Sequence, residues 1–157
     1  MCDTRLFPFD QDFSEKTCAV RCLAYVTKMP YREYLLTLSD LKPEVNGMYF
    51  VDIYRQLQKY GIGFSHSFPS ERGLFMILLY RPGAAQLYRP GAAQPHGPGD
   101  YVHYVIYHDG ILYDSLLSEP VPKTLDELRE TIEESIGTGG PVDAFFDKQI
   151  WCIRIKE

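Results

Sequence analysis

The run YVHYVIYHDGILYDS, which covers residues 101–115, limits the possible folds of this chain more than any other feature. Its two halves are rich in Tyr, Val and Ile, and they flank Asp109-Gly110. Asp-Gly between two such runs is a strong signal for a two-residue β-hairpin turn. In that register His108 pairs with Ile111, so the sequence predicts an antiparallel pair of strands in the second half of the chain.

Helical periodicity dominates the first half of the chain, and strand-like runs follow it. Apolar residues at helical spacing predict three helices there, and Gly61 is placed to end the third as its C′ glycine. A fourth helix begins with the capping box of Thr124 and Glu127. The predicted helices cover residues 18–28, 31–38, 50–60 and 124–136, and the remaining predicted strands cover residues 73–80 and 149–155. Helices followed by a hairpin-centred antiparallel sheet indicate an α+β fold, and 157 residues suit one domain, 1–157.

Charge and hydropathy exclude several classes of function. The formal net charge is -5 and the Lys and Arg residues are scattered singly, so the basic stripe of a nucleic-acid-binding protein is missing. No apolar run approaches the roughly 20 residues that span a bilayer. The first ten residues, MCDTRLFPFD, lack the basic-then-apolar pattern of a signal peptide. We therefore expect a cytoplasmic protein that binds neither nucleic acid nor membrane.

An eight-residue duplication separates two of the predicted strands. LYRPGAAQ occurs at residues 79–86 and again at 87–94, and PHGPGD follows it. Two short copies rich in Pro and Gly do not build a repeat architecture. We therefore interpret residues 81–100 as a surface loop lengthened by duplication. A substrate-contact loop is the alternative, because the segment leads into the strand that carries His103.

The chain has four cysteines, and Cys18 has the position of a reactive one. It follows Thr17, a plausible N-cap, in the first turn of the first predicted helix. The unsatisfied amides and the positive end of the helix dipole favour a thiolate there, and a thiolate is the activated nucleophile. For Cys2, Cys22 and Cys152 we expect the ordinary role of small buried hydrophobic residues with free thiols.

His103 and Asp114 supply the groups that such a nucleophile needs. In the predicted hairpin register, Asp114 lies two residues from the position opposite His103, on the same face of the sheet. An Asp carboxylate there orients the imidazole toward a cysteine on a helix that packs on that face, which is the nucleophile–base–orienter arrangement of acyl transfer. His108 is expected to face solvent in the turn. His66 and His96, in polar and Pro/Gly-rich segments, are assigned no role.

Acyl transfer also requires hydrogen-bond donors for the oxyanion. The backbone amide of Cys18 is one candidate donor. Gln11, on the segment before the first helix, supplies a side-chain amide as the second candidate, with a solvated loop glutamine as the alternative interpretation.

The ordered set of these residues resembles a known superfamily. T-C-A-V-R-C-L-A-Y-V-T followed by P-Y-R-E-Y resembles the opening of small papain-like proteins of phage and bacterial genomes, and H-Y-V-I-Y-H-D-G-I-L-Y-D-S is similar to their second half. Bacteriocin-processing peptidase domains use the same order. The resemblance covers about residues 11–120 and implies a papain-like fold with Cys18 as nucleophile, His103 as base and Asp114 as orienting acid. Gln11 falls near the oxyanion glutamine, although it stands one residue further from the cysteine than is usual.

These observations favour a papain-like cysteine peptidase or related thiol acyl-transferase that acts on a peptide or protein substrate without metal or cofactor. The alternative is a catalytically weak or inactive papain-like protein that binds a partner, for example a phage or bacterial factor acting on a host protein. A metal site of Cys18, Cys22 and a histidine is a third hypothesis. It is disfavoured because C-x₃-C on a helix is not a usual zinc spacing.

Overall fold

The computed structural model describes residues 7–9, 17–41, 48, 50–80, 102–115, 117, 119–136 and 152–157. Its helices are α1 (Cys18–Thr27), α2 (Tyr31–Thr37), α4 (Phe50–Lys59) and α5 (Leu125–Ile136). Its strands are β1 (Phe64–His66), β2 (Leu74–Tyr80), β3 (Val102–His108), β4 (Ile111–Tyr113), β5 (Val121–Pro122) and β6 (Cys152–Ile155). The duplicated segment 81–100 lies outside the described residues.

The six strands form one open sheet in the order β1-β6-β2-β3-β4-β5, and every neighbouring pair is antiparallel. This arrangement confirms the predicted α+β class and the antiparallel sheet. The last strand of the chain, β6, pairs with both β1 and β2. The C-terminal segment is therefore built into the interior of the sheet.

The hairpin of β3 and β4 has the predicted register. His108 pairs with Ile111, Tyr107 with Leu112 and Ile106 with Tyr113. Asp109 and Gly110 have φ values of 49° and 81°. Two successive positive φ values define the type I′ turn that matches the twist of the strands.

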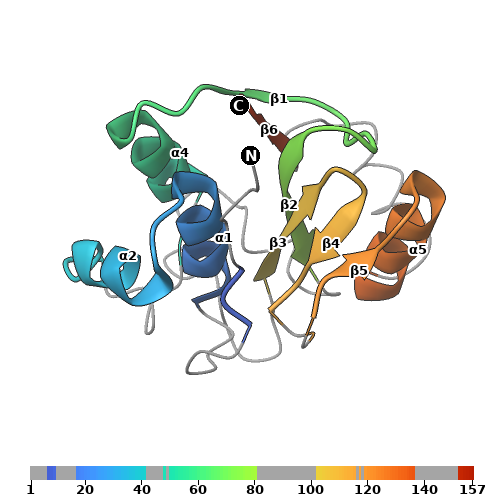
Figure 1. Cartoon of the computed structure of the whole chain (residues 1–157), viewed down its shortest axis with the longest axis horizontal. Coiled ribbons are helices and arrows are strands. Elements are labelled where there is room, and N and C mark those ends of the chain that lie inside the picture. The colour runs from blue at the N-terminus through green and yellow to red at the C-terminus, as the bar shows by residue number, and fades with distance from the viewer. Residues whose placement is uncertain are drawn as a thin grey trace, which may run out of the picture.

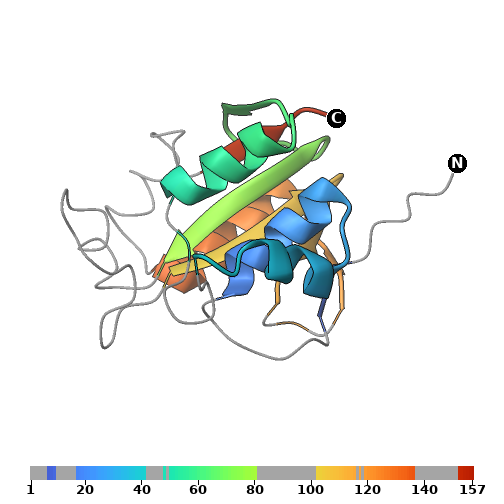
Figure 2. The same ribbon diagram turned by 90° about the vertical axis from the view of Figure 1, so that its left-hand side faces the viewer.

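Helices cover both faces of the sheet. Figures 1 and 2 show α1, α2 and α4 on one face and α5 on the other. Alternate side chains of β3 reach these two layers: the His108 imidazole meets Tyr25 of α1, and the Tyr107 hydroxyl donates to the Lys123 carbonyl beside α5. In the described part of the chain, no helix is long and apolar enough to cross a bilayer.

The helix ends follow local sequence signals, with one exception. Gly61 has a φ of 67°, and the Ile62 amide donates to the Leu57 carbonyl, so the C′ prediction is confirmed. Thr17 precedes α1 but makes no side-chain capping hydrogen bond, contrary to its expected role. Its φ and ψ of -99° and 8° lie outside the extended region that a capping side chain requires.

The capping box of α5 is confirmed in both directions. The Glu127 amide lies 3.2 Å from Thr124 Oγ1, and the Thr124 amide lies 3.0 Å from Glu127 Oε1. Hydrogen bonds from the backbone and then the side chain of Thr124 lower the pKa of the Glu127 carboxyl. The reciprocal pairing fixes the start of the helix at the predicted residue.

Candidate active site

Cys18 is the first residue of α1, and its side chain is buried, with 2% of its surface exposed. Its Sγ lies 3.4 Å from the backbone nitrogen of Tyr104, which donates a hydrogen bond to the sulfur. α1 thus places the thiol of its first residue beside the beginning of β3. The predicted position of Cys18 at a helix start is confirmed.

The geometry of β4 explains why the Tyr104 amide is directed at a sulfur. In a two-residue hairpin, every second pair of residues exchanges backbone hydrogen bonds, beginning with His108 and Ile111. By this alternation, the backbone groups of Tyr104 point to the β4 side of β3, toward the position of Ser115. However, β4 ends at Tyr113, so the ladder stops short of Ser115. Among the described contacts of β3, the Tyr104 amide donates to the Cys18 sulfur and not to a carbonyl of β4.

His103 is the residue immediately before this contact. It lies on β3 opposite Leu79, and its carbonyl carbon is bonded to the Tyr104 nitrogen. Adding this bond, about 1.3 Å, to the sulfur contact places Cys18 Sγ within roughly 5 Å of the His103 backbone. The fold therefore brings the predicted nucleophile next to the backbone of the predicted base. The His103 side chain lies outside the described part of the structure, and so does Gln11.

Asp114 lies one residue beyond the end of β4, and its side chain is buried. The chain turns away from the sheet here, because the Leu117 amide donates to the Asp114 carbonyl at 2.9 Å. The Asp114 carboxylate contributes to the raised pKa of the Cys22 thiol of α1, after burial and Cys18.

Cys22 lies one helical turn after Cys18 and is completely buried. Burial raises the pKa of the Cys22 thiol well above its ordinary value, and Cys18 and Asp114 raise it further, whereas Arg21 lowers it. A neutral, buried thiol fits the expected structural role of this residue. Burial also raises the pKa of Cys152, the other described cysteine that we expected to be structural. Cys2 lies outside the described residues.

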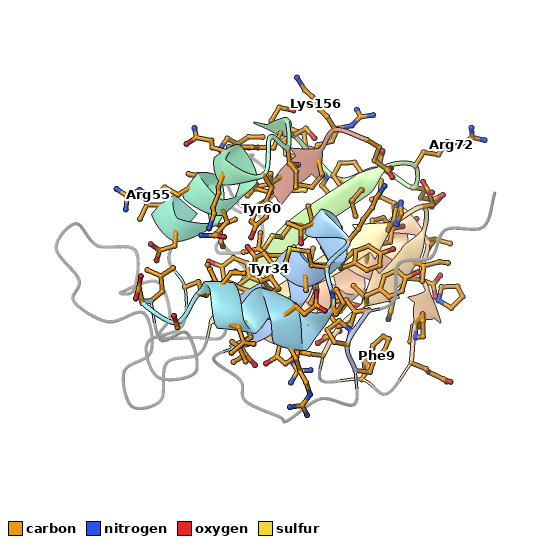
Figure 3. All side chains as sticks on the ribbon, turned by 60° about the vertical axis from the view of Figure 1, so that its left-hand side comes forward. Phe9, Tyr34, Arg55, Tyr60, Arg72 and Lys156 are labelled. Atoms are coloured by element: carbon orange, nitrogen blue, oxygen red, sulfur yellow. The ribbon has the colours of Figure 1, made fainter. Side chains whose placement is uncertain are left out.

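Arg21 is a residue whose role the sequence analysis missed. Its side chain is buried, its Nη1 donates to the Pro8 carbonyl, and its guanidinium lies 4.8 Å from the centre of the Tyr31 ring. It thereby ties residues 7–9, which run toward Gln11 in the sequence, to α1. Figure 3 shows Phe9 at the edge of the molecule, on the same segment. The sequence signal for this role was a single Arg within an otherwise apolar helix.

His108 corrects a second expectation. We expected it to face solvent, but it is buried, and its Nδ1 lies 2.6 Å from the Tyr25 hydroxyl. The type I′ turn is so short that His108 is still a strand residue and points at α1. His66, by contrast, is exposed on β1, and its Nε2 lies 3.3 Å from the Tyr54 hydroxyl. His96 lies outside the described residues.

The described part of the site thus comprises the Cys18 thiol, the Tyr104 amide that donates to it, and the buried Cys22 and Asp114 side chains. Within the described residues, no three His, Cys, Asp or Glu side chains cluster closely enough to hold a metal ion. Comparisons with protein-family models, with curated proteins and with solved structures give no match to this chain. What can be inferred about the site therefore rests on the residues themselves.

Proposed function

We propose that this chain is a papain-like cysteine peptidase, or a related thiol acyl-transferase, with Cys18 as nucleophile, His103 as general base and Asp114 as the residue that orients the imidazole. The observation that carries the proposal is the 3.4 Å contact between Cys18 Sγ and the amide that follows His103. Two segments 86 residues apart in sequence meet at this contact, so the Cys18 thiol lies beside the backbone of the strand that carries His103. The order of helices, cysteine, histidine and aspartate along an α+β chain also supports it.

The proposed reaction has two steps. The imidazole of His103 takes the Cys18 proton, and the sulfur attacks the carbonyl carbon of a peptide or isopeptide bond. The C–N bond breaks as the imidazolium returns that proton to the leaving amine, which leaves an acyl-enzyme. Water, or a second amine, then attacks the acyl carbon, gives its proton to His103 and releases the acid or the new amide. The sulfur recovers its proton from the imidazolium.

Two features of the protein support stabilisation of charge during these steps. Cys18 stands at the positive end of the α1 dipole, which favours the thiolate. The Tyr104 amide donates to the sulfur and therefore stabilises negative charge on it. Oxyanion donors are proposed to be the Cys18 amide and the Gln11 side chain.

A second candidate function is favoured by one observation, the burial of Cys18. A side chain with 2% exposure does not meet a substrate unless the surrounding structure opens. A papain-like protein that has lost activity and binds a partner protein has no need of that opening. Reactivity of the thiol separates the two candidates.

The decisive experiment is covalent labelling by a peptide vinyl sulfone, with the site found by mass spectrometry. We expect labelling at Cys18 in the wild type, none in Cys18→Ala, and at least tenfold slower labelling in His103→Ala and Asp114→Asn. His66→Ala is the matched control, because it removes an exposed imidazole from β1. Labelling of His103→Ala at the wild-type rate contradicts the proposed mechanism.

Iodoacetamide at pH 6 tests the alternative, because only a thiolate of depressed pKa reacts quickly there. Rapid modification of Cys18 that slows in His103→Ala supports the peptidase. A Cys18 that is inert in the folded protein and reacts only after addition of urea supports the inactive binding protein.

A further inference from the structure

A hollow of about 420 Å³ opens where β1, β6 and the start of β2 meet, away from Cys18. It lies on the face of the sheet opposite α4, because Phe64 and not Ser65 stacks on Tyr54 of α4. The lining residues are Ser65, Gly73, Arg154, Ile155, Lys156 and Glu157. None of them belongs to the proposed active site.

The hollow exists because Lys156 has a glycine on each side. Phe64 and Leu74 both pair with Ile155, so the next antiparallel step places Gly63 and Gly73 on either side of Lys156. The Lys156 amide donates to the Gly63 carbonyl at 2.8 Å, which continues this register beyond β6. A Cβ on Gly63 would come within 3.0 Å of Lys156 Cδ. Neither neighbour therefore fills the space around the lysine.

Arg154 forms the second cationic wall. It pairs with Ser65 on one side and Phe75 on the other, and it projects from the same face as Lys156. Its guanidinium lies 6.0 Å from the centre of the Phe75 ring, a contact that orients it. Its Nε lies 3.8 Å from where a Cβ of Gly73 would stand, so the guanidinium group leans over the glycine into the hollow.

The two cations are available to a ligand. Among the described residues, neither Arg154 nor Lys156 forms an ion pair with a carboxylate. Glu157 also lines the hollow, and its Oε1 lies 3.4 Å from His108 Nε2. A chain of net charge -5 thus brings a guanidinium, an ammonium and the Ser65 hydroxyl together around an open space.

From this arrangement we infer that the hollow binds a phosphate group. The guanidinium donates paired hydrogen bonds to two phosphate oxygens, the ammonium contributes a compact positive charge, and the serine hydroxyl donates to a further oxygen. Two cations match a group that carries about -1.5 to -2 charges at neutral pH. The volume exceeds that of phosphate alone and leaves room for the rest of a small phosphate ester or of a phosphorylated side chain. Free phosphate presents the same oxygens to the two cations.

Titration of the whole chain with inorganic phosphate, followed by ¹H–¹⁵N spectra at constant ionic strength, tests the site. We expect saturable shifts confined to the amides around the hollow, and at least tenfold weaker binding in Arg154→Ala and in Lys156→Ala, since each loses a hydrogen bond from a charged donor. Arg55→Ala is the control because it removes one positive charge from the opposite side; Figure 3 shows Arg55 on α4, well apart from Lys156. Equal weakening in Arg55→Ala, or the absence of saturation, overturns the proposal.

Gly63→Ala gives a variant that keeps every charge. The φ of Gly63 lies outside the left-handed region, so alanine fits the backbone, but its methyl group displaces the Lys156 side chain. Weaker phosphate binding by this folded variant supports the built site, and unchanged binding contradicts it. Acetate that binds as tightly as phosphate overturns the assignment of the ligand. A short phosphoserine peptide then identifies the source: tighter binding than inorganic phosphate indicates an ester, and equal binding indicates free phosphate.

Discussion

The Tyr25 hydroxyl lies 2.6 Å from Nδ1 of His108, and both side chains are buried. The two rings meet edge to face, with centroids 5.7 Å apart. This contact joins the last part of α1 to the end of β3, and the Cys18–Tyr104 contact joins the first residue of α1 to the beginning of β3. Polar contacts therefore fix the helix along the strand at both ends, and the position of the thiol depends on both.

Replacement of Tyr25 by Phe should destabilise the protein by about 1–3 kcal/mol, because the buried His108 nitrogen loses its hydrogen-bond partner. Urea denaturation followed by circular dichroism measures this loss. Tyr113→Phe is the matched control: the centre of the Tyr113 ring lies 5.1 Å from that of the Tyr25 ring, but the Tyr113 hydroxyl makes no hydrogen bond within the described part of the chain. An equal loss in both variants would show that removal of a hydroxyl from this aromatic cluster, and not the contact with His108, is responsible.

Removal of the Cys18 sulfur should change the chemical shift and the hydrogen-exchange rate of the Tyr104 amide. In Cys18→Ala the amide loses its acceptor, so we expect an upfield proton shift, faster hydrogen exchange and a stability loss of about 1 kcal/mol. Cys18→Ser restores an acceptor and should recover part of the shift. Cys22→Ala, which removes an equally buried thiol from the same helix, should leave the Tyr104 amide nearly unchanged.

The capping box of α5 allows a comparison of two threonines on one segment. Thr124→Ala removes the acceptor of the Glu127 amide and should cost about 1 kcal/mol. Thr131→Ala, inside the helix, should be neutral or slightly stabilising because alanine has the higher helix propensity. Urea midpoints of the two variants check this difference in sign, and a similar loss in both would contradict the role of the cap.

Much of the fold follows from local sequence signals. Asp109-Gly110 specifies both the turn and the pairing of β3 with β4, because a two-residue loop permits one register. Gly61 and the Thr124–Glu127 pair mark helix ends through hydrogen bonds to their immediate neighbours. In each case the determining interactions span only a few residues, so the sequence pattern contains them.

The features that were missed depend on contacts between distant segments. β1 and β5 have three and two residues, too few for a strand pattern, and they form because β6 and β4 offer them an edge. His108 was expected in solvent because its neighbours are turn residues, but its surroundings are set by Tyr25, which is 83 positions away in the chain. The Cys18–Tyr104 contact similarly requires both the helix and the early end of β4.

Alkaline pH should weaken the fold through buried groups that must stay neutral. Tyr34 is buried, its hydroxyl donates to Gln56 Oε1 at 2.9 Å, and burial raises its pKa above the ordinary value of about 10. The folded state therefore keeps the proton that the unfolded state releases. The corresponding stabilisation is complete below about pH 10 and is lost as the pH rises toward the folded-state pKa. Burial raises the pKa of Cys22 and Cys152 in the same direction, from ordinary thiol values nearer 9.

The free energy of unfolding should accordingly be steady near neutral pH and fall above about pH 9, as urea midpoints between pH 7 and 11 would show. Tyr34→Phe should lower stability at pH 7 by about 1–2 kcal/mol, because Gln56 loses its donor, and should make the alkaline decline shallower. Thr124→Ala is the control, since it lowers stability by a comparable amount without removing an alkaline titration. If both variants declined with the same slope as the wild type, the phenol of Tyr34 would not be one of the groups that set alkaline stability.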